Sequence, residues 1–152
     1  MTSKLEVVRT FLDTAWSNPP SSLLEASERT LSDDFQNVDE DGNVVMNKET
    51  YIGMGQLLAA SFEDFKWVLR DLREADDGVL MSGHFEGTHT RDLDLSAMGA
   101  GVIPASGKKI VWEDATVKWT VEGDKIVKLE PYAGAAGIGA FLAPLGVTPP
   151  SA

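Results

Sequence analysis

The sequence predicts an α+β domain in which three N-terminal helices precede a curved antiparallel sheet and cover one of its faces. Apolar residues recur at helical spacing over residues 5–62, whereas residues 65–132 alternate in polarity and are divided by turns rich in Asp and Gly. Helices that come before the strands, instead of alternating with them, are typical of α+β domains. With 152 residues, we expect one domain at 1–147 and a short C-terminal tail at 148–152.

The first helix is expected over residues 4–17, and it ends at Pro19-Pro20, which cannot continue a helix. The stretch Ser22–Glu25 then has the capping-box pattern, because a serine is followed three residues later by a glutamate. We therefore expect a short second helix that begins at Ser22 and reaches about Leu31. The apolar side of the first helix consists of Leu5, Val8, Leu12, Ala15 and Trp16.

The third helix follows a tight turn. Asp39–Gly42 has turn chemistry and lies between two short predicted strands, Phe35–Val38 and Val44–Met46. Asn47 is a favoured N-cap residue, so we expect the third helix to begin directly after it. One side of this helix carries Tyr51, Met54, Leu58 and Phe62.

Four longer strands are predicted in the second half of the chain, as two hairpins whose turns are built from Asp, Glu and Gly. We expect these strands to form the curved sheet. The segment after Tyr132 is rich in Gly and Ala, which disfavours a regular helix there. The four strands are Phe65–Glu74, Val79–Thr90, Lys108–Val121 and Lys125–Tyr132.

The composition argues against several classes of function. A formal net charge of −11 opposes binding to nucleic-acid phosphates, which needs clustered Lys and Arg. The chain has no Cys, so disulfides, thiolate metal sites and a cysteine nucleophile are excluded. Charges interrupt the apolar residues at the N-terminus, and no run reaches the ~18 apolar residues of a membrane span. We therefore expect a cytoplasmic protein with no nucleic-acid or membrane partner.

Four short motifs along the chain resemble those of one protein family. Gly87–Thr90 resembles its Gly-Thr-His-x-Gly strand end, and Ile103–Lys108 resembles its Pro-Pro-Thr-Gly-Lys turn. Glu122–Val127 resembles its Asp-Gly-Lys-Ile step, and Phe141–Val147 resembles its closing Leu-Gly segment. On these motifs the chain resembles the SnoaL-like polyketide cyclases of the nuclear transport factor 2-like, or cystatin-like, superfamily. The resemblance implies a cone-shaped sheet that encloses a cavity together with the three helices.

The chain departs from this family at the positions of the family's acid and base. After Lys-Ile the family continues Val-Glu-His-Trp, and an aspartate a few residues later is the acid/base of the cyclases. The corresponding residues here are Leu129, Glu130 and Gly134. Arg91 replaces the last glycine of Gly-Thr-His-x-Gly. A catalytic acid, if the protein has one, must therefore come from another strand.

His89 and Glu113 are the first two catalytic candidates. By alternation, His89 shares the apolar side of its strand with Met81 and Phe85, where it could donate a hydrogen bond or move protons near neutral pH. The alternative is a histidine that pairs with a backbone carbonyl at the strand end. Glu113 falls among apolar or small residues, where loss of hydration would favour its protonated form and suit it to proton transfer. The alternative there is a β-bulge that turns Glu113 to solvent.

Asp39 is the third candidate. It follows the Asp33-Asp34 pair by a spacing that resembles ketosteroid isomerases, in which such an aspartate abstracts a proton beside a carbonyl. An ordinary turn residue is the safer interpretation. The stretch Asn37–Gly42 also matches the opening of a calcium loop, but Lys48 stands where that loop needs a bidentate carboxylate. We therefore expect no metal site.

Aromatic and apolar side chains are expected to line a pocket between the helices and the sheet, because small-molecule sites are usually apolar with few polar groups. The apolar loop Leu93–Ile103 is expected to be a lid over this pocket or a dimer contact, with its glycines as hinges. The residues expected to line the ligand site are Trp16, Tyr51, Phe85, Met98 and Trp119.

The sequence supports two hypotheses on function. In the first, the domain binds a hydrophobic, carbonyl-bearing small molecule and catalyses proton transfer without a cofactor, as a cyclase or isomerase. Glu113 would then be the acid/base, His89 a hydrogen-bond donor or proton partner, and Asp39 a further candidate. In the second, the domain is a non-catalytic module that binds a small molecule or forms a homodimer through the exposed face of the sheet. Absence of the family's acid/base residues favours the second hypothesis.

Overall fold

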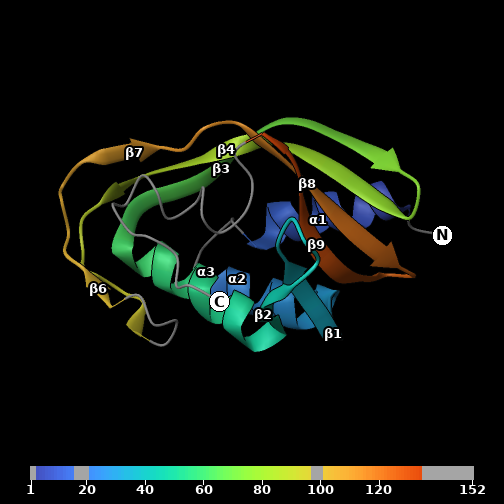
Figure 1. Ribbon diagram of the computed structural model, residues 1–152, viewed down its shortest axis with the longest axis horizontal. Coiled ribbons are helices and arrows are strands. Elements are labelled where there is room, and N and C mark those ends of the chain that lie inside the picture. Colours follow the sequence, from blue (N-terminus) through green and yellow to red (C-terminus); the bar gives the residue numbers. More distant parts are fainter. Residues whose placement is uncertain (1–2, 16–20, 97–100, 135–152) are drawn as a thin grey trace.

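The computed structural model describes residues 3–15, 21–96 and 101–134, which form three helices and a curled sheet (Figure 1). The structure confirms the predicted α+β class. Trp16, Met98 and the Gly/Ala-rich segment after Gly134 lie outside the described residues. The elements in chain order are α1 (Lys4–Ala15), α2 (Ser21–Thr30), β1 (Leu31–Val38), β2 (Val44–Asn47), α3 (Lys48–Ser61), β3 (Phe62–Ala75), β4 (Gly78–His89), β5 (Leu93–Asp94), β6 (Val102–Ile103), β7 (Lys109–Val111), β8 (Ala115–Glu122) and β9 (Lys125–Gly134).

The third helix begins where the sequence predicts. Asn47 is its N-cap, and the Oδ1 atom of Asn47 accepts a hydrogen bond from the Thr50 backbone N at 2.9 Å. At the other end, Phe62 already has extended backbone angles (φ −115°, ψ 116°) and is the first residue of β3. The helix therefore leads directly into the sheet, and β3 begins earlier than the predicted start at Phe65.

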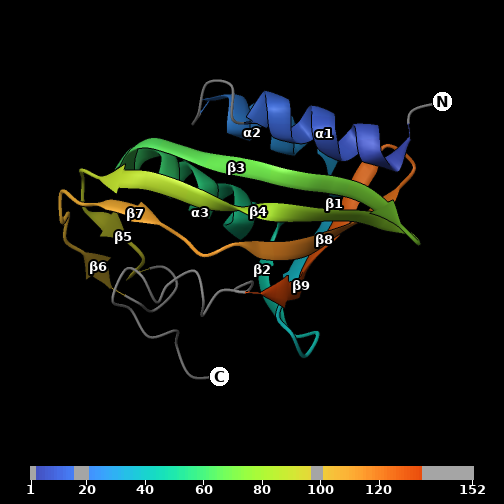
Figure 2. The same cartoon turned by 90° about the horizontal axis from the view of Figure 1, so that it is seen from above.

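The main sheet has the strand order β2-β1-β9-β8-β4-β3, and β7 also pairs with β4. β1 and β9 run parallel, whereas the other described strand pairs are antiparallel. The predicted antiparallel sheet is therefore a mixed one. Its parallel pair arises because β9 returns to β1 only after α3 and the intervening strands, a connection long enough for either direction. Figure 2 shows α1 lying along the β3–β4 hairpin.

The predicted strand Lys108–Val121 is in fact two strands. β7 pairs with the last part of β4 and β8 with its first part, and residues 112–114 between them leave the ladder. Trp112 explains the interruption, because its backbone N donates to the Phe85 carbonyl at 2.9 Å and its ring packs against the Phe85 ring, with centroids 6.5 Å apart. Strand alternation stops there. Glu113 is consequently exposed, and the expected loss of its hydration is wrong.

The side of β4 that the sequence predicts to be apolar does face the interior. Met81 and His89 are 3% and 1% exposed on this side. Between them, Gly83 leaves no room for a side chain, because a Cβ atom there would lie 2.1 Å from the Val68 carbonyl oxygen and 3.2 Å from the Trp67 ring. β3 therefore passes very close to β4 at this point. We call this side of the sheet the inner face and the opposite side the outer face.

The interior consists of two clusters of buried apolar residues. The first cluster joins α1 and α2 to the inner face, and the second lies around the C-terminal half of α3 and the start of β3. Tyr51 packs against both. The first contains Val7, Val8, Phe11, Ala15, Leu23, Ala26, Leu31, Phe35, Ile52, Val79, Met81, Trp119, Val121 and Ile126. The second contains Met46, Met54, Leu58, Phe62, Phe65, Leu93, Leu95, Ile103 and Trp112.

The apolar loop after β4 contributes to the second cluster. Its ends form the short β5–β6 ribbon, in which Leu93 pairs with Ile103. Leu93 and Leu95 are fully buried, and the Leu95 backbone N donates to the Gly101 carbonyl at 2.7 Å. The apolar character of these residues is therefore explained by packing. The central part of the loop, residues 97–100, lies outside the described residues, so its predicted role as a lid or dimer contact stays a prediction.

Candidate functional site

The inner face carries a patch of apolar side chains that the core does not seal. Val117 on β8 is paired with Met81, and Leu129 on β9 is paired with Trp119, so both point inward. Phe85 on β4 and Tyr51 on α3 face the same interior. All four side chains are only half-buried, although their neighbours in the two clusters are closed off. We call Tyr51, Phe85, Val117 and Leu129 the inner wall.

Tyr51 is the polar member of the inner wall. It lies in the first turn of α3, with its ring centroid 5.1 Å from that of Phe35 and 6.5 Å from that of Trp119. Burial raises the pKa of the Tyr51 phenol well above its ordinary value, since the charged phenolate would be poorly solvated there. The hydroxyl therefore stays protonated and remains able to donate a hydrogen bond at any physiological pH.

His89 lies deeper in the same interior, at the end of β4. Its ring stacks on Phe62, with centroids 4.7 Å apart and planes 8° from parallel. Its backbone N donates to the Lys108 carbonyl at 3.0 Å, and its own carbonyl accepts from Gly107 N at 2.8 Å. The ring is thus held firmly, yet its buried Nε2 atom has no hydrogen-bond partner among the described residues. A buried polar atom without a partner costs about 1–3 kcal/mol, so this nitrogen is a candidate contact for a ligand.

Trp67 presents a second unpartnered group on the inner side of β3. Its ring meets the Phe85 ring at a centroid distance of 4.5 Å and an interplanar angle of 70°. The indole Nε1 atom is buried and has no hydrogen-bond partner among the described residues. No pattern in the sequence distinguishes Trp67 from the other aromatic residues, because its position depends on the close passage of β3 over Gly83.

Two of the predicted catalytic residues lie away from this interior. Glu113 is exposed in the link between β7 and β8. Asp39 lies in the β1–β2 turn, where its Oδ1 accepts from the backbone N of Asp41 and of Asn43, both at 2.9 Å. The backbone N–H of Asn43 lowers the pKa of the Asp39 carboxyl. Asp39 therefore has the contacts of a turn residue, the interpretation the sequence favoured.

The residues predicted to bind ligand have different environments. Tyr51 and Phe85 belong to the inner wall. Trp119 is 2% exposed, and its Nε1 lies 3.4 Å from the Met81 sulfur, so it is part of the core behind that wall. Trp16 and Met98 lie outside the described residues.

A cluster of charged residues on the outer face was not predicted from the sequence. His84 is 8% exposed and lies between two carboxylates, with Nδ1 3.1 Å from Asp114 Oδ1 and Nε2 3.0 Å from Glu86 Oε2. Arg70 Nε donates to the same Asp114 oxygen at 2.9 Å. The alternation of β4 placed His84 and Glu86 on this side, but nothing local indicates that Asp114 joins them.

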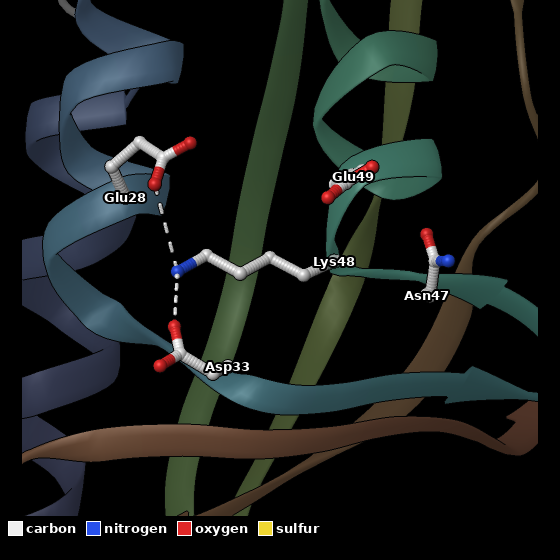
Figure 3. A pocket seen from close by; sticks show the side chains of 5 residues that line it. All are labelled: Glu28, Asp33, Asn47, Lys48 and Glu49. Atoms are coloured by element: carbon white, nitrogen blue, oxygen red, sulfur yellow. Dashed lines mark hydrogen bonds and ion pairs between the residues drawn. The ribbon is translucent and has the colours of Figure 1, made fainter.

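A polar hollow of about 330 Å³ lies between α2, β1 and the start of α3 (Figure 3). Lys48 extends into it, with Nζ 3.7 Å from Glu28 Oε2 and 3.5 Å from Asp33 Oδ1. Asn47 and Glu49 complete its lining. Because charged groups that already pair with one another line this hollow, it does not suit the apolar ligand that the sequence predicts.

Among residues 3–15, 21–96 and 101–134, no group of three or more His, Asp or Glu side chains is arranged to hold a metal ion. In the same part of the chain, no helix has the length and apolarity needed to cross a membrane.

Three helices packed on a curled mixed sheet define the nuclear transport factor 2-like, or cystatin-like, fold. The chain belongs to the SnoaL-like domain family, whose family model matches residues 8–129. This match confirms the resemblance first seen in the short motifs. No curated protein matches the chain significantly.

Solved structures support the same fold. A candidate SnoaL-like polyketide cyclase from Jannaschia sp. CCS1 is 15% identical, with 85% of this chain and 83% of that chain covered and a TM-score of 0.65. An NTF2-like protein from Burkholderia thailandensis E264 is 14% identical, with coverages of 87% and 91% and a TM-score of 0.60. A protein of ketosteroid isomerase-like fold from Catenulispora acidiphila DSM 44928, solved in complex with trimethylamine, is 16% identical, with coverages of 95% and 95% and a TM-score of 0.61. At these identities the likeness shows a shared fold.

Proposed function

We propose that this SnoaL-like domain binds a hydrophobic, carbonyl-bearing small molecule against its inner wall. The observation that carries the proposal is the half-buried state of Tyr51, Phe85, Val117 and Leu129 beside the two closed clusters of the core. Contiguous apolar surface with a few polar groups is typical of small-molecule sites. The Tyr51 hydroxyl would donate a hydrogen bond to the ligand's carbonyl oxygen.

Two substitutions test this proposal. Titration with aromatic ketones such as acetophenone and benzophenone, followed by calorimetry, should show saturable binding to the wild type. Val117→Phe should abolish that binding because the larger ring occupies the space in front of the wall. Tyr51→Phe should weaken it by roughly tenfold, the value of one hydrogen bond.

Each variant has a matched control elsewhere on the chain. Val111 is 56% exposed at the outer edge and Tyr132 is 60% exposed on β9, so Val111→Phe and Tyr132→Phe should bind the ketones as the wild type does. Absence of binding across the panel, or unchanged binding by folded Val117→Phe, would contradict the proposal.

A second candidate function is proton transfer at the end of β4, beside Phe62. It is favoured by one observation, the unpartnered Nε2 of His89. Among the described residues no Asp or Glu side chain is buried, so His89 is the strongest candidate base on the inner face. His89 would remove a proton from the carbon next to the ligand's carbonyl. Glu113 and Asp39 are weaker candidates because Glu113 is exposed in the link between β7 and β8 and Asp39 lies in the β1–β2 turn.

Exchange of the methyl protons of acetophenone in heavy water separates the two candidates; benzophenone has no such α-protons. If His89 is a base, the wild type should accelerate exchange, and His89→Gln should lose the acceleration while still binding the ketone. His84→Gln is the matched control, since the chain has two histidines and His84 lies on the outer face. Binding without any acceleration would leave the non-catalytic module as the function.

A further inference from the structure

His84 is the centre of a charged cluster on the outer face that the proposed function does not use. We call His84, Glu86, Asp114, Arg70, Lys66 and Lys109 the outer cluster. Glu86 lies two residues after His84 on β4. Its Oε1 atom forms ion pairs with Lys66 Nζ at 3.4 Å and with Lys109 Nζ at 3.7 Å. Asp114 is fixed by Arg70 on β3. The cluster therefore joins β3, β4, β7 and the link before β8.

The two contacts of the His84 ring indicate its protonation state. A neutral imidazole has one N–H donor and one lone pair, whereas the imidazolium ion donates from both nitrogens. In the outer cluster each ring nitrogen faces a carboxylate oxygen, at 3.0 and 3.1 Å. With both carboxylates ionised, both contacts are hydrogen bonds only when both nitrogens carry protons.

The carboxylates are held in their charged form. The hydrogen bond with His84 lowers the pKa of the Glu86 carboxyl, and the two lysines add to this effect. The Arg70 guanidinium lowers the pKa of the Asp114 carboxyl, with a further contribution from His84. These groups therefore stay negative well below neutral pH.

The cluster holds a segment that leaves the strand ladder. Asp114 ends the link between β7 and β8, which leaves the ladder at residues 112–114. Two residues earlier, Trp112 turns inward onto Phe62 and Phe85. The link is thus fixed on the outer face through Asp114 and on the inner side through Trp112.

We propose that His84 is a proton-operated latch that fixes the link Trp112–Asp114 to the sheet. When the ring loses a proton as pH rises, a lone pair must face one of the two carboxylates, so one of its two hydrogen bonds is lost and the link is held less firmly. When pH falls far enough to protonate Glu86 or Asp114, the latch is lost from the acid side.

Charged or polar groups from β3, β4, β7, β8 and the link surround the His84 ring. Glu86 on β4 and Asp114 on the link touch it directly, while Arg70 and Lys66 on β3 and Lys109 on β7 reach it through these carboxylates. From β8, Thr116 pairs with Ser82 at 2.8 Å between their hydroxyl oxygens, and neither is charged. The experiment therefore uses the full chain, in which all of these charged neighbours of His84 are present.

Hydrogen exchange and NMR test the latch. The Trp112 amide, which donates to the Phe85 carbonyl, reports how firmly the link is held. At about pH 5.5, its protection factor should be roughly tenfold lower in His84→Gln than in the wild type, whereas the two should agree at about pH 8.5. Nitrogen NMR of the wild-type ring should show His84 with two protonated nitrogens at the lower pH.

Two further variants complete the experiment. Asp41→Asn is the control, because Asp41 is exposed in the β1–β2 turn outside the outer cluster, and it should keep the wild-type pH dependence of the Trp112 amide. Asp114→Asn removes the carboxylate but keeps the ring, so Trp112 should be poorly protected at both pH values; this variant decides the matter if His84→Gln does not fold. Equal protection of Trp112 in wild type and variant at the lower pH, or a His84 ring with one unprotonated nitrogen there, would overturn the proposal.

Discussion

At the scale of single residues, the interior is characterised by polar atoms that the fold leaves without partners. His89 Nε2 and Trp67 Nε1 are buried and unpaired among the described residues, while the Tyr51 hydroxyl is kept protonated by burial. Buried polar groups are usually paired, so unpaired ones on an inner face with accessible apolar surface indicate a ligand contact. These groups are the polar contacts that the interior offers a ligand, and among the described residues no Asp or Glu side chain is buried with them.

Asp39 gives a residue-scale prediction with a defined pH dependence. Its carboxyl pKa is lower in the folded chain because it accepts hydrogen bonds from the Asn43 and Asp41 backbone N–H groups. A lowered folded pKa adds stability above the unfolded pKa, near 3.8, and this stability is lost as pH falls through the folded value. Asp39→Asn should thus be less stable than the wild type at neutral pH, with the difference vanishing in acid.

Urea unfolding at several pH values measures this effect. Asp41→Asn is a suitable control because Asp41 lies in the same turn but its backbone N, and not its carboxylate, takes part in these bonds. A stability difference for Asp39→Asn that stays constant from neutral pH to acid would contradict the account.

At the scale of elements, β3 and β4 set the shape of the inner face through their close passage at Gly83. Gly83→Ala would place a Cβ atom 2.1 Å from a backbone oxygen, which β3 cannot avoid without moving. We expect a loss of about 1–3 kcal/mol or more in the free energy of unfolding. In α3, Gly53 has no atom within 4 Å of its Cβ position, so Gly53→Ala should instead stabilise by about 0.5–1 kcal/mol.

Chemical unfolding of these two variants provides a direct comparison, because the same substitution is made in a crowded strand and in an open helix. If Gly83→Ala were as stable as the wild type, the close passage of β3 and β4 would be wrong.

The elements also show what the sequence could predict and what it could not. The helix N-cap at Asn47 and the inward side of β4 follow from local patterns and are confirmed. The interruption at residues 112–114 corresponds to the β-bulge that the sequence left open as an alternative, and local pattern could not decide between the two because Trp112 packs against aromatic residues from β3 and β4. Glu113 was misplaced for the same reason, since alternation was carried through a break in the strand.

The candidate site, like the fold, was predictable where it depends on local patterns. His89, Tyr51 and Phe85 could be assigned to the interior from strand and helix periodicity. The parallel pairing of β1 with β9 and the meeting of His84 with Asp114 both join residues far apart in the chain. Periodicity contains no information on such contacts, so the mixed sheet and the outer cluster appear only in three dimensions.

At the scale of the whole molecule, the chain is a SnoaL-like domain in which charge and apolar surface are separated. The net charge of −11 is carried by side chains outside the core, while the inner wall presents apolar surface toward the helices. A ligand that binds only the folded chain must also raise its stability in proportion to occupancy. Homodimerisation through the outer face remains a prediction from the sequence, which light scattering would test.

The central claim is that the interior beside the inner wall binds a small apolar molecule. The most direct measurement is methyl NMR of the full chain during titration with an aromatic ketone. The account predicts that the methyl signals of Val117 and Leu129 shift saturably with one common dissociation constant, while those of Val111 on the outer edge do not move. Shifts confined to Val111 and other exposed methyl groups, or no saturable shift at all, would contradict it.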